Sequence, residues 1–383
     1  MGRSILVAVD ASAASQAAAL WAAHNLARPG DSLHVVAIAP PIAYAMTPAA
    51  PIASAGAVAA LSLNWEQQRR AEEEQCRALL HEVVHKLPEA RREELDIHRH
   101  VLPAAGGASG VAESVVEWSK QHGVDVVVVG SRGMGAMKST LMSLVGLGSV
   151  SGYLVHHMHC PVAVCRGREQ DAQPKAKRKV MVSLDDSYTS KKALEWAVNN
   201  VLGPDDELHL VCVALPIPYP VSPGEDYTAP PLSAEEWRAE FVRSLGHAEA
   251  RAAATADYAA GPLQIVADDA AASEVLEADE FDAATQDSIH YARETVSRAV
   301  DAAASQVDRS KIFFKALAPE GGASDVGQSV VHYAKENGVD LVVLGARGMG
   351  SWKRAIMSFV GLGSVSDFVV HHLEAPVIIV KHQ

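Results

Sequence analysis

The chain repeats itself, and this duplication is the feature that most limits the folds open to it. Residues 4–26 match residues 179–201 at an offset of 175. Further on, residues 123–164 and 338–379 are identical at 25 of 42 positions, at an offset of 215. A self-similarity of this length indicates two copies of one domain rather than one large fold.

The change of offset locates an insertion in the second copy. The offset grows by 40 residues between the two matching blocks. We place the extra residues around 252–291, a stretch without Lys or Arg that carries eight acidic residues from Asp268 to Asp287. Low hydrophobicity and charge of one sign predict a solvated, partly disordered loop, with a functional acidic tether as the alternative. The predicted organisation is a first domain over 1–167, a polar linker over 168–178 and a second domain over 179–383.

Each copy alternates strand-like and helix-like segments. VDVVVVG in the first copy and VDLVVLG in the second are continuous apolar runs, as expected for strands buried on both faces of a parallel sheet. The Pro- and Ala-rich stretch 40–60 is expected to be a loop. The alternation predicts an α/β fold of two tandem, doubly wound domains, each with a five-stranded parallel sheet.

Composition excludes several classes of protein. The formal net charge of −13 argues against a nucleic-acid binder, because a polyanion would be repelled over most of the surface. No apolar run is long enough to predict a membrane span. The four cysteines show no CxxC spacing, so we expect buried thiols in a reducing compartment, most simply the cytoplasm.

Glycine-rich segments follow the fourth expected strand of each copy. Ligands of open α/β sheets bind at the carboxyl ends of the strands, and glycines let backbone N–H groups approach a ligand. Each segment ends in Gly-Ser at the start of a helix, whose N-terminus favours anions. The pattern indicates a phosphate site, with tight turns alone as the alternative. It is neither a P-loop, since Met137 precedes Lys138, nor a dinucleotide fingerprint after the first strand.

These segments, taken with the rest of the pattern, resemble the tandem form of the universal stress protein family. The matching pieces are VAVDAS and VSLDDS, VVVGSRG and VVLGARG, then LGSVSGYLVHHMHCPVAV and LGSVSDFVVHHLEAPVII. The resemblance covers both copies except the variable middle of each. It implies binding of an adenine nucleotide, ATP or AMP, with or without Mg²⁺, by a stress-responsive regulatory or signalling module.

The resemblance also assigns roles to individual positions. Asp10 and Asp185 would contact ribose or adenine, and the backbone of Ile38 and of Val213 would bind adenine. Val129 and Leu344 precede the loops. The phosphates would be held by Gly130, Gly133, Gly148 and Ser149 in the first copy and by Gly345, Gly348, Gly363 and Ser364 in the second, with Val150, Ser151, Val365 and Ser366 forming the first helical turn. Arg132 and Arg347 would neutralise phosphate, or would simply be solvated loop residues.

One feature departs from the family pattern. Fourteen residues separate the second glycine from Gly-Ser in both copies, a longer spacer than is typical of nucleotide-binding members. The spacer either extends a helical turn and keeps the phosphate site intact, or displaces Gly148 and Gly363. The alternative function is therefore a stress-related interaction scaffold that binds no nucleotide.

Catalysis and metal binding are not expected. No Ser-His-Asp or Cys-His arrangement recurs in both copies, so at most slow ATP hydrolysis would accompany binding. The pairs His156-His157 and His371-His372 are adjacent on expected helices and point about 100° apart, so one pair cannot readily chelate an ion.

The last expected strand of each copy would leave one edge of its sheet unpaired. PVAV and PVIIV begin with proline, which suits an edge strand, and an unpaired edge invites association. Universal stress proteins typically pair these strands between subunits. In this chain we predict that the two copies pair with each other as a pseudo-dimer of approximate two-fold symmetry. A further homodimer and an unknown protein partner are left open.

Overall fold

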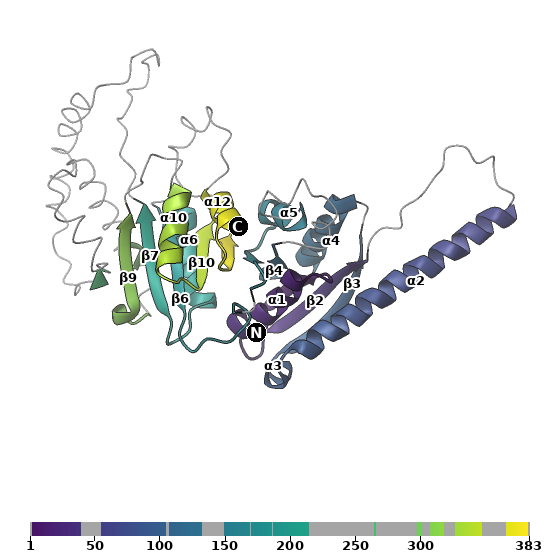
Figure 1. The fold of residues 1–383 in the computed structure, drawn as a ribbon, viewed down its shortest axis with the longest axis horizontal. Helices are drawn as coiled ribbons and strands as arrows, with labels where there is room; N and C mark the ends of the chain where they lie inside the picture. The colour runs from purple at the N-terminus through teal and green to yellow at the C-terminus, as the bar shows by residue number, and fades with distance from the viewer. Residues whose placement is uncertain are drawn as a thin grey trace, which may run out of the picture.

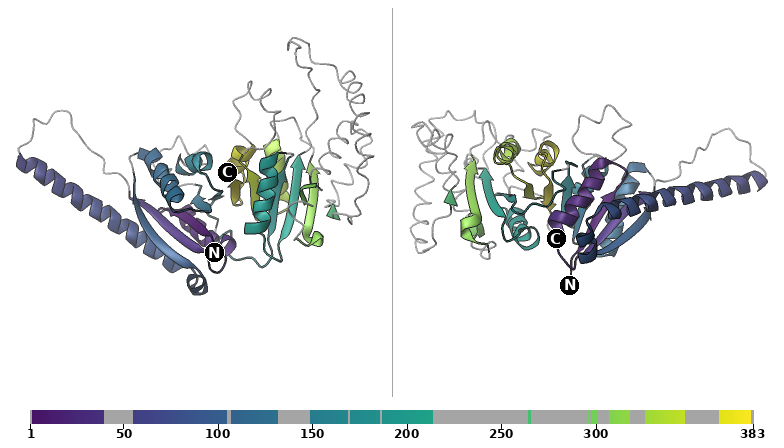
Figure 2. Two further views of the ribbon diagram at one scale, coloured as in Figure 1. Left: turned by 180° about the vertical axis from the view of Figure 1, so that it is seen from behind. Right: turned by 60° about the horizontal axis from the view of Figure 1, so that its bottom comes forward.

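The computed structural model of the chain describes residues 2–39, 55–104, 107–131, 149–168, 170–185, 187–213, 264–265, 296, 298–300, 307–317, 326–346 and 365–381. Within these residues the strands form one 11-stranded sheet with the order β3-β2-β1-β4-β5-β11-β10-β6-β7-β9-β8 (Figures 1 and 2). The strands of the first copy are β1 Ser4–Val9, β2 Ser32–Ala39, β3 Asp96–Pro103, β4 Val126–Gly130 and β5 Val162–Cys165. Those of the second are β6 Lys179–Leu184, β7 Glu207–Val213, β8 Gln264–Ile265, β9 Ile312–Leu317, β10 Leu341–Gly345 and β11 Val377–Val380.

Helices cover both faces of this sheet (Figure 1). The described helices of the first copy are α1 Ala13–Trp21, which continues as a π-helical turn over Ala22–Leu26, α2 Ala55–Lys86, α3 Glu89–Glu94, α4 Gly107–Gln121 and α5 Ser149–His157. Those of the second are α6 Tyr188–Asn200, α10 Val326–Glu336 and α12 Val365–His372, with a 3₁₀ turn at Arg309–Lys311. Strands separated by helices in this way give the expected α/β fold.

The apolar core forms two layers, one on each face of the sheet. Successive strand residues alternate between them, so that Ile5 and Val7 join one layer and Leu6 the other. The first layer lies under α1, α2 and α6, and the second under α4, α5, α10 and α12. Each layer contains residues of both copies, so the two domains share their core instead of each closing its own.

The two half-sheets join through their last strands. β5 pairs with β11 antiparallel, with Val162 opposite Ile379 and Val164 opposite Val377. The other described strand pairs in the sheet are parallel. The pairing predicted from the two proline-led strands is therefore present within a single chain.

Two arginines at matching positions cross this joint on the α1 and α6 side. Arg3 Nη1 donates to the carbonyl oxygen of Asn200 at 2.8 Å, close to the end of α6. Arg178 Nη1 donates to the carbonyl oxygen of Asn25 at 2.7 Å, at the end of the helix that begins with α1. Cations are favourable at helix C-termini because unpaired carbonyls gather there. Each copy thus caps a helix of the other.

A carboxylate in its own copy holds each of these arginines. Asp206 accepts from the Arg178 backbone N–H at 2.9 Å and from Nη2 at 2.5 Å, and only 4% of the Asp206 surface is exposed. Asp31 binds the guanidinium of Arg3 in the same way, with Nη2 at 2.6 Å. Burial alone would raise the pKa of Asp31, but hydrogen bonds from the Arg3 side chain and from the backbone outweigh it and hold this pKa below its usual value.

A second pair of cations crosses the joint on the opposite face. The Arg166 guanidinium, just after β5, donates to the carbonyl oxygens of Leu373 and Val370 at the end of α12. Lys381, which lies just after β11 and matches Arg166 in the duplication, donates to the carbonyl oxygen of Val155 in α5. The last turns of α5 and α12 are therefore held by the opposite copy.

Two loop predictions are wrong where the structure describes them. α2 begins at Ala55, inside the stretch 40–60, because the chain after Pro51 is rich in alanine, the strongest helix former. In the acidic insertion, Gln264–Ile265 form β8, which pairs parallel with β9 and makes the second half-sheet six-stranded. The rest of the insertion lies outside the described residues.

The cysteines agree only in part with the expectation that all four are buried. All four thiols are free; Cys160, Cys165 and Cys212 are buried, whereas Cys76 on α2 is half-buried. Burial raises the pKa of Cys160 to about 12.

None of the helices that the structure describes is both long enough and apolar enough to span a membrane.

A cluster of imidazoles occupies the outer part of the first copy. His34 on β2 lies beside His100 on β3, with Nδ1 of His34 and Nε2 of His100 3.1 Å apart, and its ring stacks on that of His98 at 4.9 Å. Trp118 of α4 stacks on His122 at 3.9 Å and packs against His100 at 4.8 Å. Protonating one of these rings places a positive charge beside other imidazoles that can also take up a proton.

This cluster predicts a loss of stability in mild acid. Burial first, and then the imidazoles of His100, His98 and His122, lower the pKa of His34 from 6.5 to about 4, while Asp96 acts in the opposite direction. The unfolded chain takes up this proton near pH 6.5, so the stability contributed by neutral His34 is complete above that pH and is lost as the pH falls towards 4. We expect a loss of about 1–3 kcal/mol in the free energy of unfolding, after allowing for solvent screening.

Urea titrations between pH 7.5 and 4 check this expectation through the difference between wild type and His34→Gln. The variant lacks the titrating imidazole, so its stability should depend less steeply on pH in this range. Equal slopes for the two proteins would contradict the assignment to His34.

The joint predicts a second stability effect. Asp206→Asn leaves the buried Arg178 guanidinium without a counter-charge, so the free energy of unfolding should fall by about 3 kcal/mol. Glu82→Gln, which removes one partner of an exposed ion pair with Lys86 on α2, is the control and should change little. Urea unfolding measures both, and equal effects of the two variants would show that the joint does not depend on this pair.

Candidate functional site

Asp10 lies at the carboxyl end of β1, where the chain turns into α1. One carboxylate oxygen of Asp10 accepts from the backbone N–H of Ser12 at 3.0 Å and from its hydroxyl at 2.5 Å. The Ser12 hydroxyl caps α1 by accepting from the N–H of Ser15 at 3.3 Å, and the Ser15 hydroxyl donates to the Asp10 carbonyl at 2.7 Å. Asp and Ser suit such positions because their short side chains bond to nearby backbone.

The second copy repeats this network at the end of β6. An oxygen of Asp185 accepts from the backbone N–H of Ser187 at 3.0 Å, and Ser187 caps α6 by accepting from the N–H of Ser190 at 3.2 Å. The Ser190 hydroxyl donates to the Asp185 carbonyl at 2.6 Å. Both aspartates are thus fixed at the carboxyl ends of β1 and β6 by the turns that follow them.

The glycines that end β4 and β10 have a structural reason of their own. A Cβ added to Gly130 would lie 2.8 Å from the backbone nitrogen of Ser15, and one added to Gly345 would lie 2.9 Å from the carbonyl carbon of Thr189. Neither Gly130 nor Gly345 has a positive φ, so backbone conformation does not require a glycine at either position. These two glycines therefore allow the first turn of α1 or α6 to pack on the strand, a structural role that was not predicted from the sequence and that leaves their role at a phosphate a prediction.

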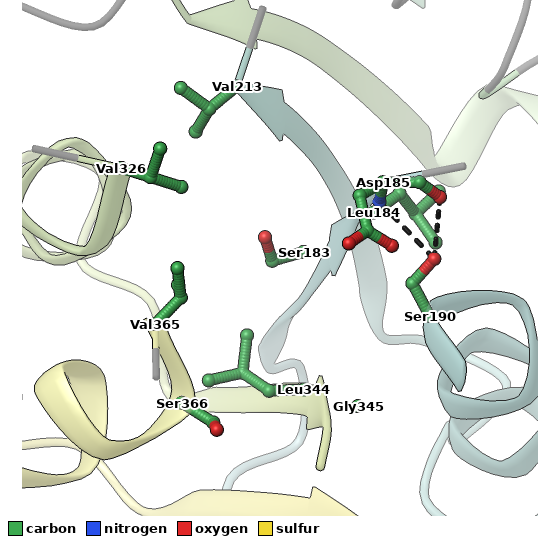
Figure 3. Close-up of a pocket in the computed structure, with 10 residues that line it drawn as sticks. All are labelled: Ser183, Leu184, Asp185, Ser190, Val213, Val326, Leu344, Gly345, Val365 and Ser366. Atoms are coloured by element: carbon green, nitrogen blue, oxygen red, sulfur yellow. Dashed lines mark hydrogen bonds between the residues drawn. The ribbon is translucent and has the colours of Figure 1, made fainter. Parts of the chain in front are cut away.

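A pocket opens beside Asp185 at the carboxyl end of the second half-sheet (Figure 3). Its described lining comes from β6, β7, β10, α6 and the first residues of α10 and α12. The lining residues are Ser183, Leu184, Asp185, Ser190, Val213, Val326, Leu344, Gly345, Val365 and Ser366. Apolar walls with a few polar groups are typical of small-molecule sites.

The predicted residues of the second copy converge on this pocket. All six that the structure describes line it: Asp185, Val213, Leu344, Gly345, Val365 and Ser366. α12 begins at Val365, directly after Ser364, so its first N–H groups lie at the pocket wall. The arrangement places an acceptor, apolar side chains and a helix N-terminus around one space.

The matching residues of the first copy occupy matching places. Ile38 lies in β2, Val129 and Gly130 end β4, and α5 begins at Ser149. Ser151 is buried, and its hydroxyl donates to the carbonyl oxygen of Ser131 at 3.2 Å. The remaining predicted positions, Arg132, Gly133, Gly148, Arg347, Gly348, Gly363 and Ser364, lie outside the described residues.

Sequence reasoning missed several lining residues. Ser190 could have been found, since serine stands at the same place in both strand-to-helix turns, DASAAS and DDSYTS. Ser183 stands two residues before Asp185, and side chains two apart on a strand share a face. Leu184 and Val326 carry no distinguishing signal, because apolar residues at strand and helix ends are common.

The described part of the pocket offers little chemistry beyond binding. None of its described lining residues is a histidine, cysteine or lysine. Across the described parts of the chain, no group of three or more His, Cys, Asp or Glu side chains is arranged to hold a metal ion. His157 and His372 stack on Tyr153 and Phe368 at 3.8 and 3.9 Å, one turn earlier on their own helices.

Comparison with known proteins adds a family to this geometry. The Universal stress protein family matches residues 1–166, 177–285 and 287–381. Universal stress protein Rv1996 of Mycobacterium tuberculosis is 32% identical over 196 residues, which are 50% of this chain and 57% of the relative. Universal stress protein PHOS34 of Arabidopsis thaliana is 31% identical over 175 residues, 43% of this chain and 62% of the relative. The chain thus spans less than two thirds of either relative.

Solved structures show weaker similarity. A universal stress protein from Archaeoglobus fulgidus covers 99% of this chain, and 96% of its own chain is matched, at 15% identity and a TM-score of 0.46. A universal stress protein in complex with cAMP covers 53% of this chain, with 96% of its own chain matched, at 17% identity and a TM-score of 0.24. The assignment rests on the sequence match, which extends through both copies: the chain belongs to the universal stress protein family.

Proposed function

We propose that the protein binds an adenine nucleotide, ATP or AMP, at the carboxyl end of each half-sheet and acts as a regulatory or signalling module in a stress response. One observation carries the proposal. The six described second-copy residues assigned to nucleotide contact line a single pocket, although they come from separate parts of the sequence. The repeated Asp-Ser network gives the first copy the same starting geometry.

The chemistry of the pocket suits a nucleoside. The Asp185 carboxylate accepts hydrogen bonds, which fits the hydroxyl groups of ribose. Val213, Leu344 and Val365 offer apolar surface for a purine ring. The N-terminus of α12 favours negative charge, so phosphates would extend towards it, with any Mg²⁺ held mainly by those phosphates.

The proposal is one of binding, without an enzymatic role beyond slow hydrolysis. The described lining residues supply no nucleophile paired with a base. The four free thiols fit a reducing compartment, so we place the protein in the cytoplasm. Nucleotide occupancy would then alter the surface offered to a protein partner of unknown identity.

A specific observation favours a second candidate, an interaction scaffold that binds no nucleotide. The close packing of Gly130 on α1 and of Gly345 on α6 explains these glycines without any ligand. The two candidates differ in whether partner capture depends on a bound nucleotide.

The first test asks whether nucleotide binds at all. We expect protein that is purified under native conditions and then denatured to release ATP or AMP, identified by mass spectrometry. Calorimetry with ligand-free protein should detect binding, and a nucleotide at a hundred times its Kd should raise the free energy of unfolding by about 2.7 kcal/mol. An absence of released nucleotide, of heat and of stabilisation at millimolar ATP and AMP would rule the proposal out.

The second test uses Asp185→Asn. Asparagine keeps an oxygen that can accept from Ser187, so the start of α6 is preserved while the negative charge is removed. Loss of a charged acceptor should weaken nucleotide binding about tenfold or more, measured by calorimetry. Glu195→Gln, on the exposed surface of the same helix, is the matched control and should bind as wild type does. Partner capture that persists in the double variant Asp10→Asn/Asp185→Asn would favour the scaffold.

A further inference from the structure

The first copy repeats the lining residues of the second-copy pocket with one polar difference. At the ten positions that line the second pocket, the aligned residues of the first copy are identical at six and apolar in both copies at three. The remaining position is Ser183 in the second copy and Ala8 in the first. The hydroxyl that Ser183 carries and Ala8 lacks is therefore the one change in hydrogen-bonding capacity among these positions.

The Ser183 hydroxyl is placed to meet a ligand. Ser183 is half-buried on β6, and Figure 3 shows its side chain between Asp185 and Val365, near the centre of the lining residues. Within the part of the chain that the structure describes, this hydroxyl has no hydrogen-bond partner. Hydroxyls in half-buried, mainly apolar surroundings normally find a partner, and here the open side is the pocket.

Ala8, at the matching position of the first copy, cannot form this hydrogen bond. Ala8 packs as a partly buried side chain against the apolar layer under α4 and α5. It carries no donor or acceptor, so a ligand hydroxyl placed against it would lose its hydrogen bond with water without replacement. The same ligand in the same pose would bind less tightly to the first copy.

We propose that the two pockets are unequal nucleotide sites and that the Ser183 hydroxyl, together with the Asp185 carboxylate, binds the adjacent ribose hydroxyls in the second pocket alone. A carboxylate accepts from one hydroxyl and a serine can accept from or donate to its neighbour, which matches the vicinal 2′ and 3′ hydroxyls. The inference rests on the proposed nucleotide binding and adds which pocket binds more tightly and which side chain selects the sugar.

The test compares reciprocal exchanges in the full-length chain. Ser183→Ala gives the second pocket the residue of the first, and Ala8→Ser does the reverse. Binding of ATP, 2′-deoxy-ATP and 3′-deoxy-ATP is followed by calorimetry, and photolabelling with 8-azido-ATP followed by peptide mapping identifies which copy is occupied. Unfolding midpoints of both variants verify that the fold is kept.

In the wild type we expect two classes of site that differ about tenfold in affinity for ATP, the tighter one labelled in the second copy. Ser183→Ala should weaken that site about tenfold and abolish its preference for ATP over at least one deoxy analogue. Ala8→Ser should tighten the first site and create such a preference there.

Other outcomes overturn the inference. Equal labelling of both copies in the wild type would do so, and so would a Ser183→Ala protein whose affinity and sugar preference stay within twofold of the wild type. Absence of any nucleotide binding by the wild type is a different result, because it removes the proposed function itself and the inference with it.

Discussion

The antiparallel pairing of β5 with β11 is the contact on which the rest of the structure depends. Both strands are buried along their whole length, so neither could serve as the exposed edge of a separate domain without offering unpaired backbone and apolar side chains to solvent. Pairing them inside one chain satisfies both edges at once. It also merges the apolar layers of the two copies, which makes the duplicated chain one structural unit.

Two helices, α5 and α12, connect this joint to the candidate sites. The first turn of α12 lines the second pocket, and its last turn accepts hydrogen bonds from Arg166 of the first copy. α5 receives the equivalent bond from Lys381. α12 is therefore held at its C-terminus by the first copy while its N-terminus borders the pocket of the second. A displacement of the joint would move the pocket walls, which gives a physical route for coupling between the two sites.

The sequence predicts the features that depend on pattern and symmetry. Duplication, buried parallel strands and the paired last strands follow from apolar runs and from the edge problem, and the residues that converge on Asp185 follow from family resemblance. The packing of Gly345 against Thr189 could not be predicted, because it depends on a strand-to-helix distance. The reciprocal bonds of Arg3 and Arg178 also escape prediction, since they join residues far apart in the chain, and the loop residues from 132 to 148 remain predictions.

The duplication also shows which contacts tolerate change. At the joint, Arg3, Asp31 and Asn25 recur as Arg178, Asp206 and Asn200. In the outer part of each copy the same backbone positions have diverged: His98, His100 and Trp118 correspond to Phe313, Lys315 and Tyr333. There the buried His209 bonds to the Tyr333 hydroxyl at 2.9 Å and stacks on Phe313 at 5.1 Å, instead of joining other imidazoles. Arg3 and Asn25 contact the opposite copy, as Arg178 and Asn200 do, so a change at these positions must suit partners in both copies. The third joint position that donates across the sheet keeps a cation, Arg166 in one copy and Lys381 in the other. The outer residues named here contact their own copy, and their chemistry has diverged further.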